Sequence, residues 1–111
     1  MTQSITLLSL PVLATAELSP ERFITAAGTY AAPGGNALGT TRTQTLVDEL
    51  TPVAVIGTAV VTAAGPLAID DRIQVGADGK ATVLAGGTAV AVALQAASAD
   101  GDRIEVLLLP N

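Results

Sequence analysis

The chain has 111 residues, half of them hydrophobic, and it carries a formal net charge of −5 with neither cysteine nor histidine. This composition excludes disulfides and thiolate metal sites, and it removes the commonest general base and metal ligand. The five basic residues are spread along the chain, which argues against a nucleic-acid partner because phosphate binding needs clustered positive charge. One domain with a core of small aliphatic side chains is therefore expected.

The first twenty residues predict an extended arm or an edge strand. The apolar run over residues 5–16 ends in a small-x-small pattern that resembles a signal-peptide cleavage site. However, residues 1–4 carry no positive side chain, and Pro11 interrupts the run. Proline donates no hydrogen bond to a strand ladder, so Pro11 favours an edge strand or an arm. We expect residues 1–20 to form this arm and residues 21–111 to form a single β domain.

The stretch from residue 19 to residue 50 has weaker signals. The residues at 19–22 form a capping pattern that predicts one helical turn at most, and a short strand is expected at 23–25. Residues 31–36 have the composition of a loop. Two interpretations of residues 40–50 stay open, because the second part could form two helical turns while alternating threonines favour a strand or loop. We favour the strand or loop.

The second half of the chain predicts a meander of short strands. Residues 53–61 are β-branched and uncharged, and they are followed by a Gly-Pro turn. The dipeptide Asp78-Gly79 lies between two strand-like runs, which is a strong hairpin signal because both positions tolerate a positive φ. Residues 88–94 alternate between branched side chains and alanine, so both faces of this strand are expected to be covered.

The last predicted strand covers residues 103–109 and leaves Leu107 and Leu109 exposed. Its inward face consists of Ile104, Val106 and Leu108. Together these patterns predict an all-β fold, a small β-sandwich or barrel of short antiparallel strands with an extended N-terminal arm. The charge-free stretches 50–69 and 81–99 are broken by glycine or proline, so no membrane partner is expected.

No group of residues predicts an active site, a metal site or a cofactor site. Asp70 and Asp71 are neighbours that would point to opposite faces of a strand, and we interpret them as a solvated turn. Asp100 and Asp102 lack the further ligands of a calcium loop. The serines have no histidine to activate them, and the glycine-rich stretch 33–39 lacks the lysine of a phosphate loop. We therefore expect a protein that is not an enzyme.

The order of several short segments resembles the family of phage capsid decoration or cement proteins. The resemblance extends over residues 22–109, and no single segment is diagnostic. The segments are residues 22–25, 28–30, 34–39, 55–61, 73–75, 78–81, 91–94 and 101–108. The stretch Asp70-Asp71-Arg72 departs from the plain glycine-containing turn expected there.

This resemblance implies a virion protein on the outer surface of an icosahedral phage head, where it stabilises contacts between subunits of the major capsid protein. It also implies a homotrimer at local threefold positions. We expect capsid or subunit contacts through Leu7, Leu8, Leu10, Pro11, Val12, Leu13, Leu107 and Leu109. The alternative for the arm residues is that they form the first strand of the same domain. The alternative functions are a fibre base or tail component and, more remotely, a hydrolase.

Overall fold

Short β-branched and small-residue runs form a single antiparallel sheet that curls into a nearly closed barrel. The computed structural model describes residues 5–111, so the first four residues of the predicted arm lie outside the described part. The strands are β1 (Thr6–Leu13), β2 (Phe23–Ile24), β3 (Gly39–Thr41), β4 (Leu50–Thr62), β5 (Arg72–Val75), β6 (Ala81–Val83), β7 (Ala91–Ala93) and β8 (Arg103–Leu108). The predicted all-β fold is confirmed. No helix among residues 5–111 is long and apolar enough to cross a membrane.

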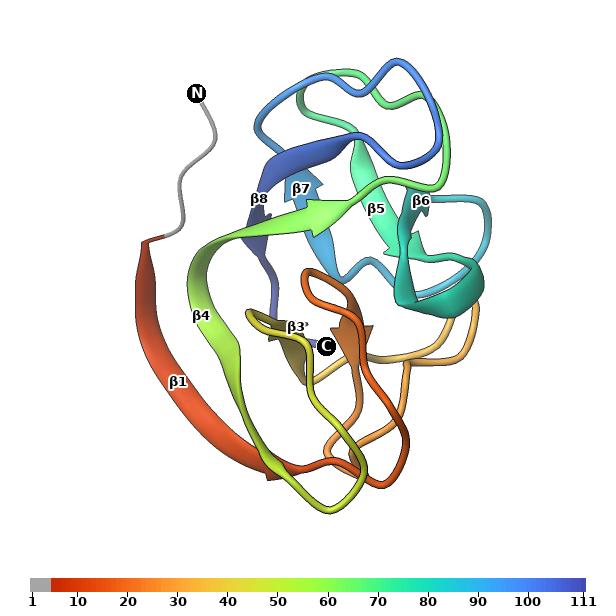
Figure 1. Cartoon of the computed structure of the whole chain (residues 1–111). Helices are drawn as coiled ribbons and strands as arrows, with labels where there is room; N and C mark the ends of the chain where they lie inside the picture. The colour runs from red at the N-terminus through yellow and green to blue at the C-terminus, as the bar shows by residue number, and fades with distance from the viewer. Residues whose placement is uncertain (1–4) are drawn as a thin grey trace.

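The strand order gives the sheet its barrel shape. Neighbouring strands follow the order β2-β3-β4-β8-β7-β5-β6, and β1 pairs with β4 outside this path. All of these strand pairs are antiparallel. An isolated bridge between Ala63, just after β4, and Ala81 of β6 links the edge strand β6 back to the end of β4 and so nearly closes the barrel. Figure 1 shows the curl, with the long curved β4 passing from β1 toward β8.

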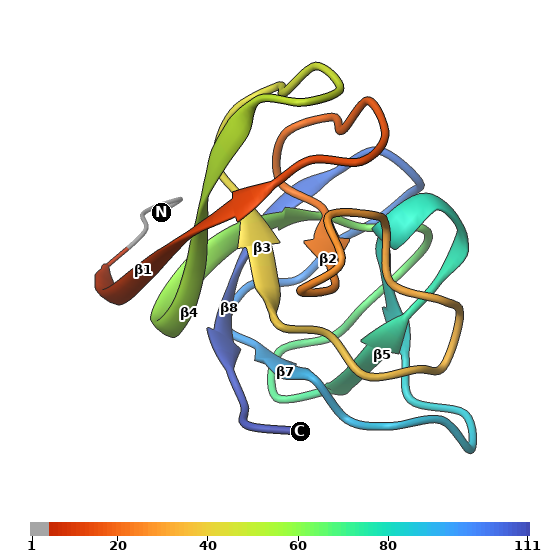
Figure 2. The same cartoon turned by 90° about the horizontal axis from the view of Figure 1, so that it is seen from below.

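Strand β4 joins two parts of the molecule because it changes partners along its length. Its first half pairs with β1 on one side and β3 on the other, whereas the second half, from Thr58, pairs with β8. Gly57 lies between the halves with a φ of 113°. A Cβ atom there would lie 2.1 Å from the carbonyl oxygen of Ile5, so only glycine fits at this change of direction. Figure 2 shows the first half of β4 beside β1 at one side of the barrel.

The core is built from small and branched aliphatic side chains. The larger cluster fills the barrel, and a smaller one lies beneath the β1–β4 pair around Leu18, Ile24 and Val53. In β7 the alanines Ala91 and Ala93 are fully buried, so the small-residue face of this strand lies against the core. Alanine on an inner face lets neighbouring strands and loops approach closely, which suits a narrow barrel.

Most turns follow the expected chemistry. The predicted hairpin between β5 and β6 is confirmed, and Asp78 and Gly79 have positive φ angles of 55° and 72°. The loop is longer than a two-residue turn, because the 3₁₀ turn η1 (Ala77–Gly79) lies inside it. The stretch at 40–50 is strand followed by loop, as favoured. The helical turn predicted at 19–22 is wrong, since Glu21 has a φ of 62° and this stretch is a bend.

The predicted pattern of buried and exposed side chains in the last strand is confirmed in part. Ile104, Val106 and Leu108 are buried as expected, and Leu107 is 41% exposed. Leu109 is only half-buried and not exposed, because the chain turns inward there and the Leu109 N–H donates to the Val90 carbonyl oxygen over 3.0 Å. Its side chain therefore contributes to the wall of a groove and not to the outer face of β8.

Candidate interaction surface

The β1–β4 pair is an edge ribbon of the barrel. Pairing runs from Leu13 opposite Leu50 to Thr6 opposite Gly57, with irregular register near Leu8. Among the described strands, β1 pairs with β4 alone, so its other edge has no strand partner. This places residues 6–13 in the position of an edge strand that is hydrogen-bonded to the domain (Figure 1).

Two prolines lie opposite each other in this ribbon, and one of them removes a hydrogen-bond donor from the free edge of β1. Pro11 pairs with Pro52, and neither residue has a backbone N–H. In an antiparallel ladder such a pair must be a non-hydrogen-bonded pair, in which the backbone nitrogen and carbonyl group of each residue point away from the partner strand. The ring nitrogen of Pro11 therefore faces the free edge of β1, where it blocks the addition of a further strand.

The ribbon exposes an unusual amount of apolar side chain. Leu7 is 74% exposed, Leu50 is 68% exposed and Leu13 is 52% exposed. We call this surface the apolar ribbon. It consists of Ile5, Leu7, Leu8, Leu10, Pro11, Leu13, Leu50, Pro52 and Ile56. Residues 5–16 and 50–69 carry no charged side chain, so the whole ribbon is uncharged. An exposed apolar surface of this kind is a candidate interaction site.

The predicted contact residues of β1 have two different positions. Leu7, Leu8, Leu10, Pro11 and Leu13 belong to the apolar ribbon. Val12 points to the opposite face from Pro11 and Leu13 and is only 7% exposed, whereas Leu10, which shares the face of Val12, is 38% exposed. Val12 belongs to the smaller core cluster beneath the ribbon.

An apolar groove continues the ribbon at the C-terminal end of the chain. It has a volume of about 370 Å³, and its walls include Leu38, Val55, Ile56, Leu108 and Leu109. Ile56 belongs to both the groove and the apolar ribbon, so the two surfaces are continuous. No sequence pattern predicts this groove, because its residues come from three separate parts of the chain.

The C-terminal residue fastens one side of this groove. The Ala37 N–H donates to the Asn111 Oδ1 atom over 2.8 Å, and the Asn111 Nδ2 atom donates to the Leu109 carbonyl oxygen over 3.0 Å. These bonds hold the last residues against the loop before β3. The two hydrogen bonds therefore hold the wall of the groove at Leu109 in place.

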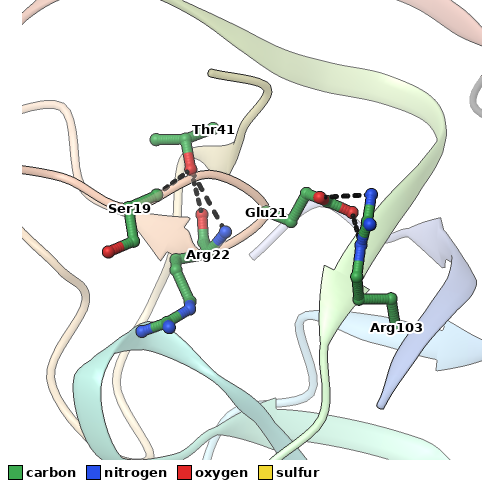
Figure 3. Close-up of polar contacts among 5 residues, drawn as sticks. All are labelled: Ser19, Glu21, Arg22, Thr41 and Arg103. Carbon is green, nitrogen blue, oxygen red and sulfur yellow. Dashed lines mark hydrogen bonds and ion pairs between the residues drawn. The ribbon is translucent and has the colours of Figure 1, made fainter. Parts of the chain in front are cut away.

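A second feature is a polar cluster at the opposite edge of β4, which Figure 3 shows. Glu21 and Arg103 form a two-pronged ion pair, with Nε–Oε2 and Nη2–Oε1 distances of 2.8 and 2.6 Å. The Thr41 hydroxyl donates to the Ser19 carbonyl oxygen and accepts from the Arg22 N–H, over 2.8 and 3.1 Å. These contacts fasten the bend at 19–22 to β3 and to the start of β8.

The acidic turns have structural partners. The Asp102 carboxylate accepts hydrogen bonds from the N–H and hydroxyl of Ser98 and from the Ala99 N–H, and these bonds lower the pKa of Asp102. The Asp71 carboxylate accepts from the Ala68 N–H over 2.9 Å. Within residues 5–111, no three acidic side chains come together in a group that could hold a metal ion.

Comparisons with known proteins agree with this picture of a structural β protein. The fold resembles the crystal structure of the head fibre gp8.5 N base of bacteriophage phi29, with a TM-score of 0.77 and 18% sequence identity. The similarity covers 92% of this chain and 93% of that one. The sequence matched none of the curated proteins with which it was compared. It does match the phage cement protein family over residues 3–108. The chain therefore belongs to the phage cement protein family and is a virion component of the head exterior.

Proposed function

We propose that this protein binds the outside of an icosahedral phage head and stabilises contacts between subunits of the major capsid protein. The observation that carries the proposal is the apolar ribbon, which leaves large uncharged side chains in water on a protein of net charge −5. Burial of apolar surface contributes about 25 cal/mol per Å². Covering this ribbon with a capsid subunit is therefore favourable. Because the ribbon carries no charge, this contact does not remove a charged group from water.

We further propose that the protein acts as a homotrimer at local threefold positions of the shell. A trimer presents three apolar ribbons, so that the first contact raises the effective concentration of the other two. Three modest contacts then give tight binding to a shell that displays repeated sites. The protein would stabilise the assembled shell because it binds that state in preference to dispersed subunits.

Within this proposal, residues 1–20 supply the contact arm and residues 21–111 form the domain that presents it. Leu107 lies outside the ribbon and is a secondary contact candidate, together with the groove wall at Leu109. The position of β1 within the sheet supports contact through its side chains. The proline at its free edge argues against contact through added backbone hydrogen bonds.

A second candidate function is the base of a head fibre. It is favoured by the similarity to the phi29 head fibre base, which extends over almost the whole of both chains. Such a base would also bind the head, but its main role would be to hold a further structure. It would bind heads without raising their resistance to heat.

The test is co-sedimentation of the purified protein with mature, undecorated heads, with light scattering to measure its oligomeric state. We expect saturable binding as a trimer and greater heat resistance of the heads. A Leu7→Ser/Leu50→Ser variant should bind at least about tenfold more weakly, since each fully buried leucine is worth about 1.5–3 kcal/mol. Its thermal stability should be unchanged, because both side chains are exposed.

The matched control is Ile69→Ser/Val83→Ser, which removes two exposed aliphatic side chains away from the ribbon. This control should bind heads like the wild type. Equal binding by the ribbon variant and the wild type would exclude the ribbon as the contact. No binding of the wild-type protein to heads would reject the cement function itself.

A further inference from the structure

The turn between β3 and β4 lies beside the chain that follows β1, at the end of the apolar ribbon. The Ala14 N–H donates to the Glu49 carbonyl oxygen over 2.9 Å, and the Asp48 N–H donates to the Ala14 carbonyl oxygen over 2.8 Å. Leu18 and Thr45 exchange two further backbone hydrogen bonds. Figure 1 shows the two loops side by side at the start of β4. The turn is therefore fastened to the ribbon.

Hydrogen bonds within the turn hold its shape. The Glu49 N–H donates to the Leu46 carbonyl oxygen over 3.2 Å, and the Glu49 Oε1 atom accepts from the Leu46 N–H over 2.9 Å. Asp48 lies between them with a φ of 69°, a conformation that aspartate and asparagine adopt more readily than most residues. The side chains at this turn are therefore presented in a fixed arrangement.

Two large apolar side chains occupy the exposed corner of this turn. Leu46 and Val47 are each more than half exposed. Turns usually carry glycine, proline, asparagine, aspartate or serine at such positions, so the fold does not require a leucine and a valine here. They continue the apolar ribbon past Leu50, where β4 begins. We call residues 46–49 the tip.

Carboxylates surround this apolar corner. Asp48 and Glu49 belong to the tip, and both are exposed. Glu17 is held beside the tip because the Gln44 Nε2 atom donates to the Glu17 Oε1 atom over 3.2 Å. Among residues 5–111, none of these three carboxylates forms an ion pair. The tip differs in this respect from the rest of the ribbon, which is uncharged.

No positive side chain comes from the segments that form this end of the molecule. The sequence has neither lysine nor arginine over residues 1–21 and 43–71. Arg42 is the nearest arginine in the sequence, and it lines a cavity together with Arg103 and Glu21. The apolar corner is therefore bordered by negative charge, which complements an apolar surface bordered by positive charge.

We propose that the tip docks into an apolar depression on a major capsid protein subunit, at a place where lysine or arginine side chains form the rim. Leu46 and Val47 enter the depression, and the carboxylates of Glu17, Asp48 and Glu49 face the basic rim. The turn is already ordered by its own hydrogen bonds, so little conformational freedom is lost on binding. This inference rests on the proposed function and adds a charged, orienting contact to the uncharged ribbon.

The experiment is co-sedimentation of the full chain with undecorated heads over a series of NaCl concentrations. Wild-type binding should weaken as salt screens the charged contact. A Leu46→Ser/Val47→Ser variant should bind at least about tenfold more weakly at every salt concentration. A Glu17→Gln/Asp48→Asn variant should bind about three- to tenfold more weakly at low salt and lose most of the salt dependence.

Two matched variants control for general effects of substitution. Asp70→Asn/Asp78→Asn removes the same number of negative charges at two exposed aspartates with positive φ, in loops before and after β5. Ile69→Ser/Val83→Ser removes two exposed aliphatic side chains outside the tip. Both controls should bind heads and respond to salt like the wild type. Thermal unfolding of each variant establishes that it is folded.

The outcomes separate this inference from the cement function. Normal binding by both tip variants, with binding by the wild type, would reject the tip as a contact and leave the cement function standing. Weaker binding by the apolar variant alone would overturn the basic rim. A smaller oligomer of the tip variants in light scattering would show that the tip covers another copy, so the capsid assignment would be wrong. No head binding by the wild type would reject both proposals.

Discussion

Gly39 lies where two strands approach so closely that no side chain fits between them. It begins β3, and a Cβ atom there would lie 2.0 Å from the Ala54 carbonyl oxygen of β4. The neighbour is backbone and not a flexible side chain, so it has little freedom to move away. This single position therefore fixes the distance between β3 and β4.

The Gly39→Ala variant should lose about 1–3 kcal/mol of unfolding free energy, because the added methyl group overpacks a buried site. Urea unfolding followed by circular dichroism measures this change. Gly65→Ala is the matched control, since a Cβ atom at Gly65 would have no atom within 4 Å, and its effect should stay within about 0.5 kcal/mol. Equal stability of the two variants would contradict the close approach of β3 and β4.

Asp102 shows how one carboxylate organises a turn. Hydrogen bonds from the Ser98 and Ala99 N–H groups and the Ser98 hydroxyl favour its ionised form, so its pKa in the folded state is lowered from 3.8. A lowered folded pKa stabilises the protein above the unfolded pKa, and this contribution is lost as the pH falls through the folded value.

The Asp102→Asn variant should therefore melt at a lower temperature than the wild type at neutral pH. The difference in melting temperature should shrink as the pH falls below 3.8 and through the lower folded pKa of Asp102, below which the wild-type carboxyl is also neutral. Thermal unfolding of both proteins over a pH series measures it. A difference that is constant across the series would show that the charge of Asp102 is not the cause.

At the scale of elements, the β1–β4 ribbon combines an exposed apolar face with a protected edge. Pro11 faces the free edge of β1, so it withholds a donor at the place where another strand would add. The face and the edge thus have separate roles. The face is the proposed contact surface, and the edge lacks a donor that pairing with another copy would need.

The Pro11→Val variant should restore an N–H at the free edge without removing a hydrogen bond inside the sheet. We expect concentration-dependent association beyond the wild-type oligomer, with little loss of thermal stability, as measured by light scattering and thermal unfolding. Pro66→Val, in the exposed loop after β4, is the control and should not associate further. A large loss of stability in Pro11→Val would show that Pro11 faces β4 instead.

The position of β1 also determines how the arm hypothesis should be tested. Removing residues 1–11 would take away most of the pairing along the first half of β4. Such a deletion would change the sheet and the contact surface together. Substitutions of exposed ribbon residues separate these effects, since they leave the pairing intact.

At the scale of the whole molecule, contacts distant in sequence close the barrel. Glu21 and Arg103 are 82 positions apart, and their ion pair joins the bend before β2 to the start of β8. The bridge between Ala63 and Ala81 links the edge strand β6 to the end of β4. The result is a nearly closed barrel with its apolar ribbon on one side.

The features that could be predicted from the sequence are those that depend on local patterns of residues. The all-β class, the Asp78-Gly79 hairpin and the inward face of the last strand follow from alternation with period two and from turn residues, which act over a few positions. The order of segments identified the family, and the sequence comparison confirmed it. Composition alone limited the chemistry, because a chain without histidine and cysteine lacks the commonest catalytic bases and metal ligands.

Tertiary structure alone decided which of these residues are exposed and which are buried. Alternation could not show that Val12 enters the core or that Leu109 turns into a groove. Strand register and the approach of distant segments settle these positions, because burial depends on what lies opposite a side chain and not on its neighbours in sequence.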